Sequence, residues 1–396
     1  MQARARRPER FRRGLLGGLV ALAVVGLASG CATNPVTGQS ELMLLSEEEE
    51  VQFGKQAFTE LHWQQGGPLQ IDAATQGYLD GIVRHLHQVS HRPNLPVDFT
   101  LQSASEPNAW AIPGHTAMNR GLLQYLENEA QFAFVMGHEM GHVAARHSAA
   151  RQSRASLGNA SLGILRAASD VAGLGAMGGL AVGAAGAGTQ LLLLSYDRGQ
   201  ELQADQLGAL YMARAGYDPR EAVRSHEVLN HAIDAYLANL GQRRGDPSVM
   251  SQILATHPRH EVRVGELQAY IQTLSPSEVR IDGDGRHAER WLQRTEPVRR
   301  LAPAYARYDR AVLAFTAAAK AAEQKQSEVV RQKLAESQRE IEAAIQLADQ
   351  AQFATFQGYL HAVQGRKGEA RSAFNRAVGL FPGYQPALRA LARISS

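Results

Sequence analysis

The chain has 396 residues, of which 44% are hydrophobic and 20% charged, and its formal net charge is +3. It is too apolar for a disordered protein, and its length allows about two or three domains. Residues 1–30 hold six basic residues and one acidic residue, which leaves 35 basic against 37 acidic residues in the remainder. This balance excludes the strongly basic surface of a nucleic-acid-binding protein, so we expect no nucleic-acid partner.

Residues 1–30 have the pattern of an export signal. An arginine-rich start precedes an apolar stretch at 15–28, which is too short and glycine-rich for a membrane span. Cys31, the only cysteine, then follows in a sequence that resembles a bacterial lipobox, although Ala28 stands where leucine is usual. We expect a lipoprotein signal peptide at 1–30 and lipid attachment at Cys31, with cleavage nearby and a free thiol as the alternative. Ala32, in place of a retention aspartate, favours the outer membrane.

The next hundred residues predict helices and extended segments. Residues 32–46 are expected to form a polar tether with turns. A capping box predicts a helix at 46–57, and apolar periodicity predicts another at 71–89. Alternation at 97–101 predicts a strand, and residues 108–114 form a second extended segment that ends at Pro-Gly.

A helix from Asn128 to about His147 carries an HExxH motif. Residues four apart share one helix face, so His138 and His142 can bind one ion, and Glu139 can reach a water beside it. Two imidazole nitrogens with an open position are typical of catalytic zinc. A buried helix with two hydrogen-bonded histidines is the alternative for an isolated motif.

Residues 171–195 contain no charged residue. One membrane crossing there would place His142 and the third ligand described next on opposite sides of the bilayer. We therefore expect either a flexible lid or hairpin over the cleft, or a packed pair of small-residue helices.

The third ligand lies on a helix predicted at 196–214. Glu201 can donate a carboxylate oxygen, and Asp205, one turn later, can accept the outer N–H of a ligating histidine. With the two histidines of the motif, this is the donor set of gluzincin zinc peptidases, with one Zn²⁺ per chain. A metzincin is excluded because Ala145 and Ser148 replace the required glycine and histidine.

The C-terminal third is predicted to be helical. We expect a metallopeptidase domain at 31–275, a linker at 276–300 and a helical domain at 301–396. The pattern at 344–347 recurs at 377–380 and predicts a few tetratricopeptide-like hairpins, with an ordinary helical bundle as the alternative. Such helices present a grooved face to a peptide or partner.

These motifs resemble the family of HtpX and the CAAX prenyl endopeptidases, and residues 31–38 with the helical tail resemble its periplasmic lipoprotein branch, the BepA-like proteases. The resemblance covers nearly the whole mature chain and is carried by residues 108–114, 119–123 and 137–142, by Arg146-His147 and by Glu201–Asp205. It implies a mainly α (α+β) fold, in which a gluzincin-type domain with a small edge sheet precedes C-terminal tetratricopeptide-like repeats.

The resemblance also implies function. The chain is expected to be a zinc endopeptidase of the periplasm, lipid-anchored to the outer membrane, that degrades misfolded or stalled envelope proteins with Glu139 as general base. Asn108 and Ala109 would pair with the substrate backbone. His257 and Arg263 are candidate oxyanion donors, with a helix cap and a surface salt bridge as their alternatives. His257 as a fourth zinc ligand that holds the enzyme latent is a further alternative.

A protein of another class remains open. The chain could be a periplasmic chaperone or assembly factor whose repeats bind the outer-membrane protein insertion machinery. Glu139 argues against a purely structural metal site, because structural zinc needs no general base.

Overall fold

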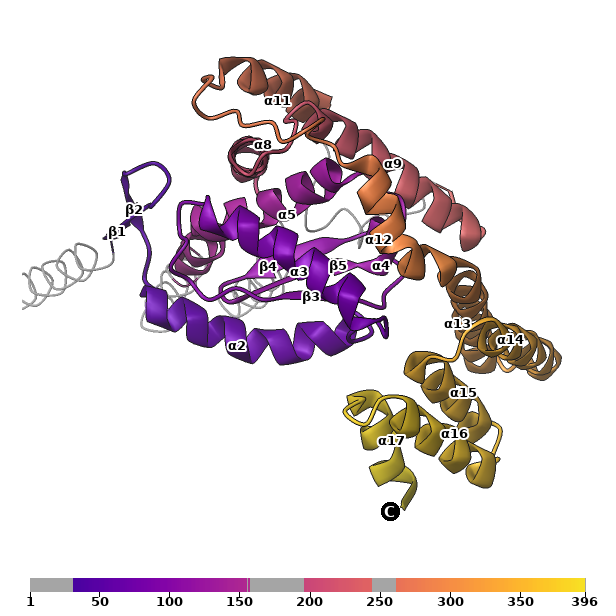
Figure 1. Ribbon diagram of the computed structural model, residues 1–396. Helices are drawn as coiled ribbons and strands as arrows, with labels where there is room; N and C mark the ends of the chain where they lie inside the picture. Colours follow the sequence, from indigo (N-terminus) through magenta and orange to yellow (C-terminus); the bar gives the residue numbers. More distant parts are fainter. Residues whose placement is uncertain (1–30, 155, 157–195, 244–260, 396) are drawn as a thin grey trace, which may run out of the picture. The chain divides into compact units, whose positions relative to one another are not determined.

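The structure is a computed structural model (Figure 1). It describes residues 31–154, 156, 196–243 and 261–395. The chain divides into two compact units, each built from two stretches: residues 1–52 with 142–196, and residues 53–141 with 197–396.

Three features expected from the sequence lie outside the described residues. They are the signal peptide at 1–30, the uncharged segment at 171–195 and His257. Among the helices of the described residues, none is both long and apolar enough to cross a membrane.

The second unit contains a three-stranded sheet of order β3-β5-β4, formed by β3 (Phe99–Gln102), β4 (Ala109–Ile112) and β5 (His115–Asn119). β3 runs parallel to β5, whereas β4 and β5 form an antiparallel hairpin. Gly114, at φ 98°, makes the tight connection. The sequence patterns predicted the first two strands but missed β5, whose residues lack clear alternation of polar and apolar side chains. Because β5 lies between β3 and β4, β4 forms one edge of this sheet.

Two helices pack against this sheet (Figure 1). α3 (Ala73–Gln88) contacts β3, and Asp72 caps it by accepting the N–H of Thr75 at 2.8 Å. α2 (Glu47–Gln64) begins with the predicted capping box between Ser46 and Glu49. It extends beyond the predicted end at residue 57 because Phe58 stacks on His115, with ring centroids 4.1 Å apart.

The described part of the first unit starts with a hairpin of β1 (Cys31–Thr33) and β2 (Ser40–Leu42). Asn34 orders the turn, because its Oδ1 accepts the N–H groups of Val36 and Thr37. Its Nδ2 donates to the carbonyl of Ala145 at 3.2 Å. Residues 32–46, expected as a tether, thus include a paired hairpin held by a buried asparagine.

The HExxH motif lies on α5 (Glu129–Ala144), which follows the short helix α4 (Arg120–Leu123). As predicted, Asn128 caps α5, with Oδ1 accepting the N–H of Gln131 at 3.0 Å. α5 ends a little before the predicted residue 147, because Arg146 adopts a left-handed conformation at φ 54°. Within the first unit, its buried guanidinium pairs with Glu50 at 3.2 Å.

Three further helices of the described residues follow in the second unit. They are α8 (Arg198–Arg214), α9 (Glu221–Asn239) and α11 (Glu261–Thr273). α11 packs on α8 and α9. A capping box between Asp197 and Gln200 starts α8.

The stretch expected as a linker at 276–300 contains α12 (Ala288–Arg300). Trp291 on this helix is fully buried and donates its indole N–H to the carbonyl of Leu126 at 2.7 Å. A buried tryptophan with a satisfied N–H anchors α12 in the fold, so this part of the stretch is packed against the rest of the unit.

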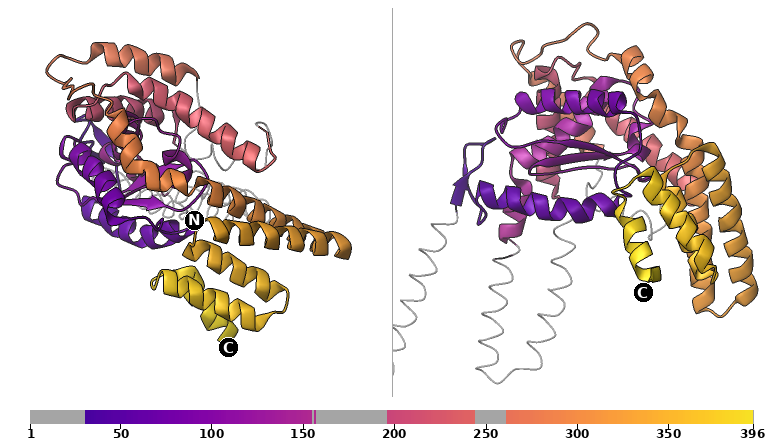
Figure 2. Two further views of the ribbon diagram at one scale, coloured as in Figure 1. Left: turned by 45° about the vertical axis from the view of Figure 1, so that its right-hand side comes forward. Right: turned by 60° about the horizontal axis from the view of Figure 1, so that its bottom comes forward.

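The C-terminal part is helical, as predicted, and consists of α13 (Ala302–Glu323), α14 (Ser327–Leu347), α15 (Ala351–Val363), α16 (Lys367–Leu380) and α17 (Gln385–Ser395). α13 packs along α14, and α15 along α16 (Figure 2). Gly358 is required in the second pair, because a Cβ there would lie 2.4 Å from the ring of Phe374. The predicted fold class, mainly helical with small sheets, is confirmed.

Candidate metal centre

Glycines bring α5 and α8 into close contact. A Cβ at Gly208 would lie 2.9 Å from the backbone nitrogen of His138, and one at Gly141 would lie 3.2 Å from the Cα of Ala204. Any larger side chain would separate the two helices. The backbone of α8 can therefore approach the HExxH helix closely enough for Glu201 to face His138.

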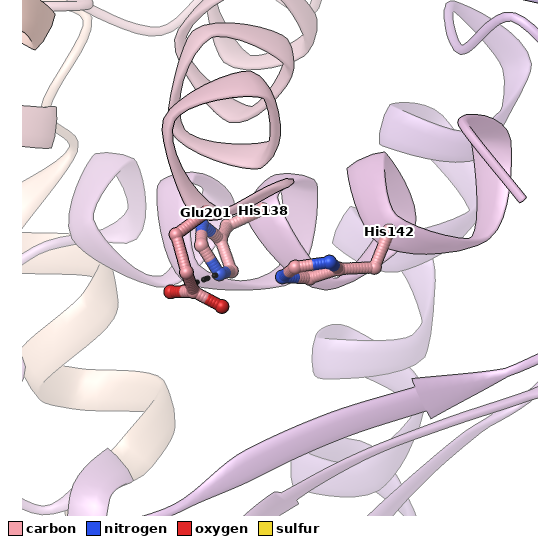
Figure 3. A group of neighbouring side chains, drawn as sticks. All are labelled: His138, His142 and Glu201. Atoms are coloured by element: carbon pink, nitrogen blue, oxygen red, sulfur yellow. Dashed lines mark ion pairs between the residues drawn. The ribbon is translucent and has the colours of Figure 1, made fainter. Parts of the chain in front are cut away.

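His138, His142 and Glu201 come together as a buried cluster (Figure 3). One ligand atom from each residue lies within 4.8 Å of the others. The two histidines are one turn apart on α5, and both rings point toward the carboxylate of Glu201, which has 0% exposure (Figure 3).

The outer nitrogen of His138 is held by Asp205. Nδ1 of the ring lies 2.9 Å from Asp205 Oδ1, whereas Nε2 faces Glu201 Oε2 at 3.9 Å. Burial alone would raise the pKa of Asp205, but hydrogen bonds from His138 and Arg263 hold that pKa well below its usual range. Asp205 is therefore an ionised acceptor that orients the His138 ring.

Arg263 connects the two carboxylates of α8. Its Nε and Nη2 donate to Asp205 at 2.7 Å each, and its Nη1 lies 2.6 Å from Glu201 Oε2. Burial lowers the pKa of Arg263, but Asp205, Glu201 and Glu139 outweigh this effect and raise it. The guanidinium stays charged and compensates the buried acidic groups.

The second histidine of the motif is held by aromatic neighbours within the first unit. Nδ1 of His142 lies 2.8 Å from Nδ1 of His147, so one of these nitrogens donates and the other accepts. The ring of Tyr196 stacks on His142 at a centroid distance of 3.5 Å. Arg151 covers the Tyr196 ring at 3.9 Å. These contacts fix the plane of the His142 ring.

The donor set fits a zinc ion. Both ligand histidines engage Nδ1 in a side-chain hydrogen bond, so Nε2 is the nitrogen that would bind the metal. Two neutral imidazoles and one carboxylate match the ligands that zinc takes in hydrolytic sites. The residues His138, His142 and Glu201 could thus hold one metal ion.

Two other residues border this cluster. Glu139 is buried beside His138 on α5, where the sequence predicted it. His226 on α9 was not anticipated, since an isolated histidine in a helix carries no motif. Its Nε2 lies 3.7 Å from Asp205 Oδ1, and burial lowers its pKa to about 4. His226 is therefore neutral at physiological pH.

Of the remaining predicted site residues that the structure describes, one joins this cluster and the others lie elsewhere. Arg263 joins the cluster through Glu201 and Asp205, and its role as an oxyanion donor stays a prediction. Ala109 begins the edge strand β4, directly after Asn108, whose carbonyl accepts the N–H of Asn119 at 2.8 Å. Cys31 opens β1.

A histidine pair from an HExxH helix and a glutamate from a second helix define a metal centre of the gluzincin type. The chain belongs to peptidase family M48, whose family model matches residues 73–271, about half of the chain.

Similarity to characterised proteins agrees with this assignment. The chain is 27% identical over 289 residues to the beta-barrel assembly-enhancing protease of Escherichia coli K12, covering 70% of this chain and 56% of that protein. It is 27% identical over 220 residues to the mitochondrial metalloendopeptidase OMA1 of Arabidopsis thaliana, covering 55% and 41%. It is 30% identical over 138 residues to metalloprotease YcaL of Escherichia coli K12, covering 34% and 51%. The chain spans about half the length of these curated relatives.

Proposed function

We propose that the protein is a zinc endopeptidase of the bacterial cell envelope that degrades misfolded or stalled outer-membrane proteins. The observation that carries this proposal is the buried group of His138, His142 and Glu201 with Glu139 beside it, in a chain of peptidase family M48. A purely structural metal site would need no adjacent carboxylate outside the ligand set.

Zinc bound to this group would supply a Lewis acid that polarises the scissile carbonyl and activates water. Glu139 accepts the proton of the attacking water and returns it to the leaving amine nitrogen. Asp205 holds the His138 ring through Nδ1, and Arg263 holds Asp205 and Glu201 in place. Because these groups are buried and paired before substrate arrives, little reorganisation is needed during reaction.

The substrate chain would bind along β4. In the described residues this strand pairs with β5 on one side only, so its other edge offers backbone N–H and C=O groups to an extended peptide. Recognition through the backbone does not depend on side chains, which suits a protease that acts on unfolded chains. Asn108 and Ala109 start this edge.

The location and partners of the protein form part of the proposal. We place the mature protein in the periplasm, anchored to the outer membrane by a lipid on Cys31. The hairpins α13–α14 and α15–α16 would act as tetratricopeptide-like repeats and contact the outer-membrane protein assembly machinery. The similarity to a beta-barrel assembly-enhancing protease supports this role.

The alternative function is that of an assembly factor or chaperone that works without proteolysis. The packed helical hairpins of the tail favour it, because stacked helix pairs commonly present a binding groove. In that case the metal centre would stabilise the fold only.

The variant Glu139→Gln separates these functions. It removes the base but no ligand, so we expect one zinc per chain by elemental analysis and a loss of casein cleavage of about 10²–10⁴-fold. Glu127→Gln, an exposed carboxylate just before α5, is the matched control and should cleave at the wild-type rate. His138→Ala and Glu201→Ala should lose both metal and activity.

Unchanged cleavage by Glu139→Gln would exclude the peptidase mechanism. If this variant also supports outer-membrane protein assembly as well as the wild type, the assembly-factor function is favoured. The anchor is tested separately, since Cys31→Ser should release the protein from outer membranes and leave its zinc content unchanged. Sedimentation of this variant with salt-washed membranes would exclude the lipid as the sole anchor.

A further inference from the structure

A second candidate site lies where α4, α9 and the beginning of α13 meet (Figure 1). It is a cavity of about 310 Å³, and none of its lining residues belongs to the metal centre. The lining includes Arg120, Tyr125, Tyr236, Asn239, Ala306 and Asp309.

Arg120 is the principal charged group of this cavity. The residue is only 2% exposed, and its guanidinium lies over the ring of Tyr305 at 3.9 Å from the centroid. Nη1 donates to Gln124 at 3.1 Å, and Nη2 donates to Ser105 Oγ. Gly121 keeps the arginine in this place, because a Cβ there would collide with the carbonyl of Ser105 at 1.8 Å.

The charge of Arg120 has no ionic partner among the residues that the structure describes, since none of their carboxylates lies within 4.0 Å of it. Its Nε also lacks a hydrogen-bond acceptor there. Burial lowers the pKa of Arg120, which records the cost of keeping this charge away from water. Asp309, in the same cavity, acts on Arg120 electrostatically and offsets part of this cost, but its carboxylate does not contact the guanidinium. A buried guanidinium without a contacting carboxylate favours the binding of an anion, and its planar shape suits a carboxylate.

The other polar groups of the cavity restrict what the anion can be. Asn239 Nδ2 lies 3.5 Å from Asp309 Oδ2, and Asn239 Oδ1 accepts a hydrogen bond from Arg310 Nη1 at 3.1 Å. Asp309 can accept a hydrogen bond from the N–H of a ligand amide, and Asn239 can donate one to its carbonyl. Asp309 would repel a dianion such as phosphate more strongly than a single carboxylate.

Size and wall composition point the same way. A volume of about 310 Å³ is at the lower end of ligand pockets and admits one or two amino-acid residues rather than a nucleotide. Tyr125 and Tyr236 form half-buried aromatic walls for an apolar side chain. A ligand that combines one carboxylate, an adjacent amide and an apolar side chain satisfies all these groups.

We propose that this cavity binds the C-terminal residue of a polypeptide, with its carboxylate at Arg120 and its amide N–H at Asp309. The choice of a polypeptide rests on the proposed function, because a protease that acts on unfolded chains meets free chain ends. The site would hold one end of the substrate independently of the metal centre.

Binding is tested by fluorescence anisotropy with a labelled short peptide ending in leucine, either as the free acid or as the C-terminal amide. The zinc-loaded Glu139→Gln protein prevents cleavage of the probe. We expect the free acid to bind at least tenfold more tightly than the amide. When Arg120→Met is introduced into the Glu139→Gln protein, the affinity for the free acid should fall to that for the amide. The affinity for the amide should not change.

Two further variants keep the test decisive. Arg307→Met removes an exposed arginine of α13 that does not line the cavity, and should bind the free acid unchanged. Ala306→Trp fills the cavity without removing a buried charge, and should abolish binding even if Arg120→Met fails to fold.

Equal binding of acid and amide, or undiminished binding by Ala306→Trp, would refute the site. Displacement of the peptide by inorganic phosphate as effectively as by the unlabelled free acid would show an unspecific anion site and also overturn the proposal. Casein cleavage by the wild type is measured separately. Lost peptide binding with intact cleavage therefore contradicts only this inference, and lost cleavage with intact binding contradicts only the proposed peptidase.

Discussion

Arg263 and Arg120 are both buried guanidinium groups, with 6% and 2% exposure, but their surroundings differ. Arg263 makes ion pairs with two carboxylates, Asp205 and Glu201. Arg120 contacts a tyrosine ring, a hydroxyl and an amide, all of them neutral. Accordingly, the pKa of Arg263 is raised despite burial, whereas that of Arg120 is lowered by it.

This difference distinguishes Arg263, whose charge is compensated within the protein, from Arg120, whose charge we propose is compensated by a ligand. At the metal centre, removal of the Arg263 guanidinium would leave the carboxylates of Asp205 and Glu201 without a counter-charge in the protein interior. In the cavity, removal of the Arg120 guanidinium would remove a desolvation cost, so its main effect should be on the affinity for the peptide. The same substitution at the two positions should therefore have unlike consequences.

The largest effect is expected for Arg263→Met. Because Asp205 and Glu201 lose their counter-charge, the free energy of unfolding should fall by about 3–5 kcal/mol. Urea denaturation of the zinc-free protein measures it. Arg307→Met, which breaks an exposed pair with Glu340, is the control and should cost less than about 1 kcal/mol. A similar small loss for Arg263→Met would contradict the network.

A pH dependence should follow from His226, which faces Asp205, Arg263 and His138. Burial holds its pKa at about 4 in the folded protein, below the ordinary histidine value of about 6.5, so the unfolded chain binds the proton more readily. The contribution of neutral His226 to the free energy of unfolding is fully present above pH 6.5. It is lost as the pH falls toward 4, by about 3 kcal/mol. Denaturation across this range should show a shallower loss for His226→Leu than for the wild type; parallel curves would exclude the effect.

The hydrogen bond between His142 and His147 extends the comparison to a pair of histidines. His147→Leu removes the acceptor that holds His142, so we expect the zinc dissociation constant to rise by about 10–100-fold. His147→Gln retains an acceptor and should restore part of the affinity, whereas a merely space-filling role would let leucine bind zinc like the wild type. Competition with a metal chelator provides the measurement, and His231→Leu, at an exposed histidine of α9, serves as the control.

The smallest effect is expected for Arg120→Met. Loss of two hydrogen bonds and the stacking on Tyr305 is offset by removal of a desolvated charge, so the free energy of unfolding should change by less than about 1.5 kcal/mol. The denaturation assay used for Arg263→Met applies here. A loss as large as that of Arg263→Met would mean that Arg120 is needed for folding, and would remove the contrast between the two sites.

The sequence predicted local structure best where the responsible contacts are close along the chain. The capping residues Ser46 and Asn128 were identified because a cap bonds to an N–H three residues later. The missed strand β5 pairs in parallel with β3, which lies earlier in the chain, and the unexpected hairpin at residues 31–42 is held by Asn34 through the distant carbonyl of Ala145. α12 in the expected linker is likewise fixed by Trp291, which bonds to the distant carbonyl of Leu126.

For the metal centre, the sequence alone determined the chemistry that is available. The HExxH spacing places two imidazoles on one helix face, and the downstream Glu-x-x-Ala-Asp pattern offers a carboxylate and an orienting acceptor, because both follow from the geometry of a single helix. Only the tertiary structure decided that Gly208 and Gly141 let the two helices meet, that Arg263 neutralises Glu201 and Asp205, and that Arg120 is buried without a contacting carboxylate. Burial and charge pairing depend on residues brought together from distant parts of the chain, which no local pattern records.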